Sequence, residues 1–167
     1  MKNLILFILF ISILIVSCKK PEKQYDIGIS DVLHKTFFSH LNCKSDVYYN
    51  ILIRNNTLYV DGKLNNEFGN YQGNLNKTEL KILDEIIIKL NPKNRIEKEI
   101  NPTTGMTALI IKENGKVLDS LVDFKIQWNQ ADLNLFKFVG KIICEKKLIK
   151  INDTIDYPTW EMVKPPE

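Results

Sequence analysis

The sequence predicts an α+β fold in which an antiparallel sheet of about five strands carries two helices packed on one face. The expected element order is β-β-β-α-β-β-α. Two observations predict it: strand-like runs joined by short turns recur twice along the chain, and each group is followed by apolar residues at helical spacing. Meandering strands with helices between them favour an antiparallel sheet covered on one side.

The first group of strands lies between residues 47 and 75. Residues 47–54 are β-branched and aromatic with partial alternation, which is typical of a strand. Asn55 and Asn56 tolerate the left-handed conformation of a tight hairpin turn, so residues 57–60 are expected to return beside them. Asp61-Gly62 is interpreted as a further turn, and residues 68–75 as a looser third strand.

The first helix has the clearest local signal in the chain. Asn76 and Glu79 form a capping-box pattern, flanked by Leu75 and Leu80 as a hydrophobic staple. Apolar residues then recur on one helical face. They are Leu80, Leu83, Ile86, Ile87 and Leu90. The Asn91-Pro92 pair is expected to end this helix.

The second group repeats the pattern of a hairpin followed by a helix. Residues 106–111 and 116–124 are predicted strands, joined by a turn at residues 113–115. A helix is expected from Gln130 to Glu145. Residues 148–151 are predicted to add an edge strand.

The N-terminus has the layout of a secretion signal. Lys2 precedes an apolar run over residues 4–16, which is short for a transmembrane helix of about 20 residues. Residues 15–18 resemble the lipobox of bacterial lipoproteins, with a small Ser17 before an obligatory cysteine. This resemblance implies cleavage before Cys18 and attachment of lipid to its sulfur. The alternative is a transmembrane anchor that ends in a chance cysteine.

The chain therefore divides into four parts. Residues 1–17 are the expected signal peptide and residues 18–29 a lipidated tether. Residues 30–151 form the single α+β domain, in which residues 30–41 are compatible with either a helix or a strand. Residues 152–167 form a tail rich in proline and aromatic residues.

Lipid on Cys18 would leave two further cysteines, Cys43 and Cys144. Exported compartments are oxidising, so these two thiols are a candidate disulfide bond. Two separate buried thiols are the alternative, because the sequence does not show whether Cys43 and Cys144 lie close together.

No catalytic, cofactor-binding or metal-binding site is expected. The chain has two histidines, His34 and His40, and no recognised nucleophile, phosphate-binding or metal motif. A net charge of only +3 argues against nucleic acid as a partner. We therefore predict that the protein is not an enzyme.

The C-terminal tail holds two weaker candidates. Thr154 lies in an Asp-Thr-Ile triplet that resembles the acceptor of bacterial O-glycosylation, against the alternative of an unmodified loop. Tyr157 and Trp160 are candidate contacts for a partner protein, since tyrosine and tryptophan are favoured interface anchors. The alternative is that this tail folds back over its own sheet.

A set of short motifs follows in order between residues 43 and 151: Val47-Tyr48 with Ile51, Asp61-Gly62, Gly69 with Gly73, Pro102-Thr103-Thr104 and Asn114-Gly115-Lys116. Taken together, these motifs resemble those of an uncharacterised domain family found in lipoproteins of Bacteroidetes-type bacteria. The chain departs from the family pattern in having Cys43 alone where relatives often have two cysteines, and Asp46 where they have proline. The resemblance implies a fold and a location in the cell envelope, and no activity.

These observations lead to three functional hypotheses. The first is a lipid-anchored, non-catalytic binding or accessory domain that contacts another envelope protein. The others are an inhibitor or immunity-type protein against a secreted enzyme or toxin, and a hydrolase with an unrecognised site. The expected location is the cell envelope, at the outer membrane and on its periplasmic face, with the membrane contacted through lipid on Cys18.

Overall fold

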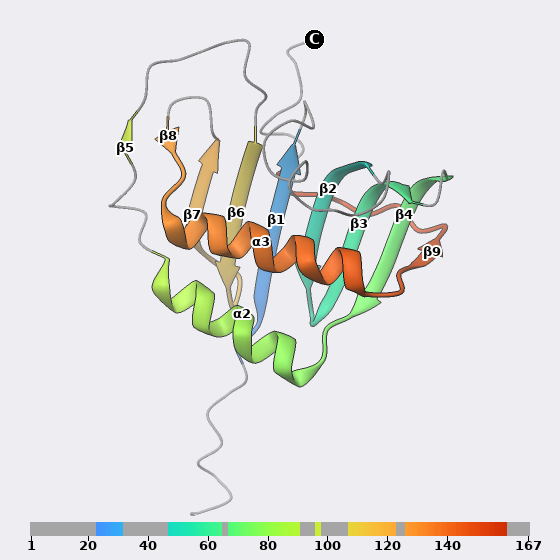
Figure 1. Cartoon of the computed structure of the whole chain (residues 1–167), viewed down its shortest axis with the longest axis horizontal. Helices are drawn as coiled ribbons and strands as arrows, with labels where there is room; N and C mark the ends of the chain where they lie inside the picture. The colour runs from blue at the N-terminus through green and yellow to red at the C-terminus, as the bar shows by residue number, and fades with distance from the viewer. Residues whose placement is uncertain are drawn as a thin grey trace, which may run out of the picture.

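The computed structural model describes residues 23–31, 47–64, 67–90, 96–97, 107–122 and 126–159. These residues form a seven-stranded antiparallel sheet, a small two-stranded sheet and two helices that lie over one face of the large sheet (Figure 1). The large sheet contains β1 (Tyr25–Asp31), β2 (Val47–Arg54), β3 (Thr57–Leu64), β4 (Glu67–Asn74), β6 (Thr107–Glu113), β7 (Lys116–Val122) and β9 (Ile149–Ile151). The other elements are β5 (Ile96–Glu97), β8 (Ile126–Gln127), α2 (Lys77–Lys89) and α3 (Gln130–Glu145).

The expected fold was wrong in both strand number and element order. The large sheet runs β7-β6-β1-β2-β3-β4-β9, so the first strand of the described chain lies in the interior of the sheet, beside its middle strand β2. Most of β1 falls within the expected tether of residues 18–29, because the polar residues just before β1 mask a short alternating pattern. β1 pairs with β2 on one side and with β6, about 80 residues later, on the other.

Two further differences come from pairings that are distant in sequence. Strands β5 and β8 pair with each other as a second, two-stranded sheet. Strand β3 continues through Asp61 and Gly62 to Leu64, so the expected turn at these residues was wrong. Gly62 instead pairs with Gly69 of β4.

The two tight hairpin turns are confirmed. Asn55 and Asn56 connect β2 to β3 with φ of 49° and 63°, and Asn114 and Gly115 connect β6 to β7 with φ of 49° and 79°. Successive left-handed residues match the twist of the flanking strands, which explains the use of asparagine and glycine here.

The hydrophobic core lies between the sheet and the two helices. Alternate residues of the central strands face the helices and are almost fully buried. They are Ile27, Ile29, Ile51, Ile53, Leu58, Val60, Leu109 and Ile111. α3 packs Leu135, Phe136 and Val139 into this cluster, whereas α2 adds Leu83 and Ile87.

The opposite face of the sheet is crossed by the residues that follow β9. The Thr159 hydroxyl lies 2.7 Å from that of Ser30, which in turn donates to Asn50 Oδ1 at 2.6 Å. A Cβ at Gly28 would lie 3.1 Å from Pro158 and 3.2 Å from Thr159, so glycine at this position of β1 permits the close crossing. The segment passes behind the sheet in Figure 1 and is part of the folded domain.

Candidate functional site at the N-terminal end of the domain

A cluster of polar groups lies at the end of the sheet where the chain enters β1, which we call the N-terminal end. Lys23 Nζ lies 3.0 Å from Glu113 Oε1 on β6 and 3.5 Å from Asp84 Oδ1 on α2. The same nitrogen donates to the Tyr25 hydroxyl at 3.3 Å. Lys23 therefore links the start of β1 to the end of β6 and to the middle of α2.

Tyr25 makes a second connection between β1 and α2. Its hydroxyl donates to Asp84 Oδ1 at 2.5 Å, and the residue as a whole is 8% exposed. Burial of the ring, together with this hydrogen bond, raises the pKa of Tyr25 to about 12. The hydrogen bond to Glu113 is the main reason that the pKa of Lys23 is raised.

These shifts bear on what the cluster can do chemically. A general acid or base works best with a pKa near the operating pH. The pKa of Tyr25 and that of Lys23 move away from neutrality, so Tyr25 stays neutral and Lys23 stays charged at physiological pH. Neither Tyr25 nor Lys23 is therefore suited to proton transfer near neutral pH, and their contacts hold β1, α2 and β6 together.

The chain just after Lys23 is held by backbone as well as side-chain contacts. The Gln24 amide donates to Asn114 Oδ1 at 3.2 Å, and the Asn114 amide donates to the Gln24 carbonyl at 2.8 Å. At the same end, the Leu75 amide donates to the Asn56 carbonyl at 2.8 Å and joins the approach to α2 to the β2–β3 turn. The point where the chain enters the domain is therefore fixed relative to the β6–β7 turn, and the β2–β3 turn is fixed relative to the start of α2.

A cavity of about 210 Å³ opens beside this cluster. Ile53 and Leu83 supply buried apolar walls, while Asn56 and Lys81 are exposed at its edge. Its other lining residues include Lys23, Tyr25, Leu80 and Asp84. Sites for drug-sized ligands usually enclose about 300–1,000 Å³, so this cavity suits only a small group.

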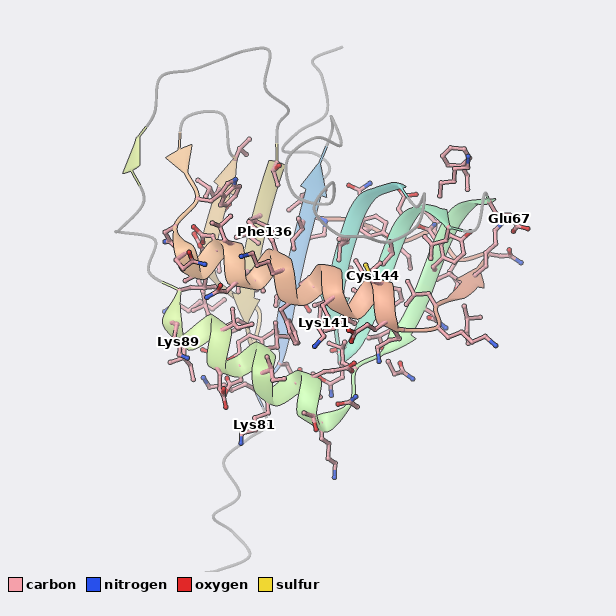
Figure 2. The ribbon with its side chains drawn as sticks, viewed as in Figure 1. Glu67, Lys81, Lys89, Phe136, Lys141 and Cys144 are labelled. Carbon is pink, nitrogen blue, oxygen red and sulfur yellow. The ribbon has the colours of Figure 1, made fainter. Side chains whose placement is uncertain are left out.

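The candidate disulfide residues are only partly described. Cys144 lies on the last turn of α3 (Figure 2) and is disulfide-bonded. Its partner lies outside the described residues, as do Cys18 and Cys43. Pairing of Cys43 with Cys144 and lipidation of Cys18 therefore stay predictions.

The tail candidates differ in their surroundings. Thr154 is exposed in the segment after β9, where an enzyme can reach its hydroxyl, and its glycosylation stays a prediction. Tyr157 is only 7% exposed and donates to Asn70 Oδ1 at 3.1 Å. Burial and the nearby Asp61 carboxylate raise the pKa of Tyr157. Tyr157 thus packs on its own sheet, and Trp160 lies outside the described residues.

The remaining sequence candidates give no further site. His34 and His40 lie outside the described residues. Among the residues that the structure describes, no group of three histidine, cysteine, aspartate or glutamate side chains is placed to hold a metal ion. In the same residues, no helix has the length and apolar character needed to cross a membrane.

The cluster around Lys23 was not predicted from the sequence. Tyr25, Ile27 and Ile29 alternate with polar or small residues, which is a strand signal that could have marked β1. Nothing in the sequence indicated that Asp84, 59 residues after Tyr25, would meet its hydroxyl.

Comparison with known proteins adds no further assignment. No family model, curated protein or solved structure matches this chain.

Proposed function

We propose that this chain is an exported bacterial lipoprotein, held in the cell envelope by lipid on Cys18, whose domain acts by binding rather than by catalysis. The lipobox-like residues 15–18 and the apolar run before them support the anchor. The short distance in sequence from Cys18 to β1 would keep the domain close to the membrane.

The disulfide bond at Cys144 is the observation that carries the proposal of export. Disulfide bonds persist in oxidising compartments outside the cytoplasm and are rare in reducing ones. The chain has three cysteines, and lipid on Cys18 would leave Cys43 as the partner of Cys144 within the same chain. Export, lipidation and disulfide formation are therefore mutually consistent.

The polar cluster at the N-terminal end supports binding rather than catalysis. Lys23 and Tyr25 have pKa values raised away from neutrality, and their contacts join β1, α2 and β6. Such groups stabilise a surface without exchanging protons at physiological pH. We propose that the partner is another component of the envelope.

The anchor is tested by intact mass spectrometry of protein purified from its own membranes, with Cys18→Ala as the matched variant. We expect the mass of residues 18–167 plus lipid, and loss of both processing and lipid in Cys18→Ala. A full-length, lipid-free mass in the unmodified protein would overturn the proposal and favour a transmembrane anchor.

The disulfide is tested on the same material by mapping peptides without reductant. We expect a peptide that links Cys43 to Cys144, with Cys144→Ser as the control that removes it. A link between Cys18 and Cys144 would contradict the proposal, because the sulfur of Cys18 cannot form both a disulfide and a thioether. Loss of a native disulfide from a small exported domain costs about 2–5 kcal/mol, so Cys144→Ser should also lower the urea midpoint.

A further inference from the structure

We propose that the outer face of α2 lies on the membrane surface and contacts anionic lipid headgroups. By the outer face we mean the side of the helix that points away from the core, with the exposed residues Lys77, Lys81, Ile82, Ile88 and Lys89. This inference rests on the proposed lipid anchor at Cys18 and specifies which surface of the domain faces the bilayer. It follows from the length of chain between the anchor and the domain, the contacts of α2 with the start of β1, and the composition of the helix surface.

The chain between Cys18 and the domain is short. Four residues separate Cys18 from Lys23, the first residue that the structure describes. Even fully extended, five residue steps span at most about 18 Å. A lipid on Cys18 therefore keeps the N-terminal end of the domain within about 18 Å of the anchor.

Among the described elements, α2 is the helix tied to this end. Asp84 at its centre accepts a hydrogen bond from Tyr25 and lies 3.5 Å from Lys23 Nζ. Lys81, one turn earlier, lines the same cavity as Lys23. Figure 1 shows α2 lying across this end of the sheet, with α3 further along the strands. Anchoring at Cys18 would thus bring α2 closer to the bilayer than α3.

The outer face of α2 has the composition of a membrane-surface helix. Leu83 and Ile87 point into the core, and the opposite side carries exposed Lys77, Lys81 and Lys89. Within the described part of the chain, none of these three lysines forms an ion pair, and Figure 2 shows Lys81 and Lys89 projecting away from the sheet.

Two apolar side chains accompany these lysines. Ile82 is 40% exposed and Ile88 is 65% exposed, whereas Glu85 is the acidic residue on this outer face. Lysines attract the anionic headgroups, and exposed apolar side chains insert at the boundary between headgroups and acyl chains. Both contributions require a nearby bilayer, which the short connection to Cys18 would supply.

The test uses the full-length lipoprotein, purified with its lipid and reconstituted into vesicles that contain phosphatidylglycerol and a nitroxide-labelled headgroup lipid. A fluorescent probe is attached to Thr78→Cys on α2 or, as the matched control, to Asn134→Cys on α3. Both native residues are exposed and uncharged. We expect markedly stronger quenching at position 78, because attraction of the α2 lysines to anionic headgroups falls off within about a Debye length and would draw α2, rather than α3, onto the surface.

A second pair of variants identifies the groups responsible. Replacing the three α2 lysines by glutamine and the two isoleucines by serine should abolish the excess quenching at position 78. Lys137→Gln with Lys141→Gln on α3 should leave it unchanged. Higher salt or purely zwitterionic vesicles should reduce it, because attraction of lysines to anionic lipid is screened.

The outcomes separate this inference from the lipid anchor. Equal quenching at positions 78 and 134 in protein whose mass includes lipid would overturn the α2 contact and leave the anchor standing. Protection of the position-78 probe in native membranes but not in protein-free vesicles would overturn it in favour of a protein partner. A lipid-free mass would overturn both proposals.

Discussion

The two helices begin with the same kind of cap, but they bury different shares of their residues in the core. Asn76 with Glu79, and Asn129 with Asp132, form complete capping boxes at the starts of α2 and α3. α3 then buries seven of its residues along one side, whereas α2 buries Leu83 and Ile87.

Their outer faces differ as well. Exposed large apolar residues occur on α2, at Ile82 and Ile88, and none is found on α3. α3 is therefore a core element that the sheet requires. α2 covers one end of the sheet and keeps apolar side chains exposed on its outer face, so two helices with equal local signals pack on the core to different extents.

The largest expected difference between the helices is in the free energy of unfolding that is lost when an apolar side chain is truncated to alanine. Leu135→Ala in α3 should lower the free energy of unfolding by about 2–5 kcal/mol, because it leaves a cavity around a fully buried side chain. Ile88→Ala on the outer face of α2 should change it by less than about 0.5 kcal/mol. Urea unfolding of both variants measures the difference. A large loss in Ile88→Ala would show that the outer face of α2 contributes to folding.

The stability lost on removing each helix cap should differ between α2 and α3 by a smaller amount. The hydrogen bonds made by the Asn76 cap are exposed, whereas those made by the Asn129 cap are partly buried. Asn76→Ala should cost about 1 kcal/mol, and Asn129→Ala closer to 2 kcal/mol, because its unpaired amides are less accessible to water. The same urea experiment compares them, with Asn→Ser at each site as the variant that retains a cap. Equal losses of stability in the two alanine variants would contradict the expectation that the partly buried cap contributes more than the exposed one.

The hydrogen bond between Tyr25 of β1 and Asp84 of α2 should contribute least to the free energy of unfolding, and its contribution should depend on pH. The pKa of Tyr25 is raised from 10.0 to about 12 in the folded protein. As pH rises, Tyr25 therefore loses its proton in the unfolded chain at a lower pH than in the folded protein. The stability that Tyr25 contributes is complete below pH 10.0 and is lost as pH rises towards about 12. The raised pKa of Lys23 acts in the same direction.

Tyr25→Phe isolates this contribution. The variant should be slightly less stable at neutral pH because it lacks the hydrogen bond to Asp84, and its stability should fall less steeply above pH 10.0. Thermal unfolding over that pH range, with Tyr59→Phe as a control on a half-buried tyrosine of β3, provides the measurement. An identical slope in Tyr25→Phe and the unmodified protein would show that Tyr25 does not link α2 to β1 in this way.

Much of the local structure could be predicted because its determinants are close in sequence. The turns at Asn55-Asn56 and Asn114-Gly115 need left-handed backbone, and α2 and α3 begin at asparagine caps with an acidic residue three positions later. The strand register could not be predicted in the same way. β1 is seven residues long, and its partners β2 and β6 become neighbours only when the sheet assembles.

The sequence by itself determined the secretion-signal pattern, the two helices and the tight turns, because each depends on residues that lie close together in sequence. Tertiary structure decided that β1 is an interior strand between β6 and β2, that Tyr157 packs on its own sheet, and that Lys23 and Tyr25 meet Asp84. These contacts join segments separated by tens of residues, and long-range packing rather than local preference selects them. The same packing leaves the outer face of α2 exposed beside the point where the chain enters the domain.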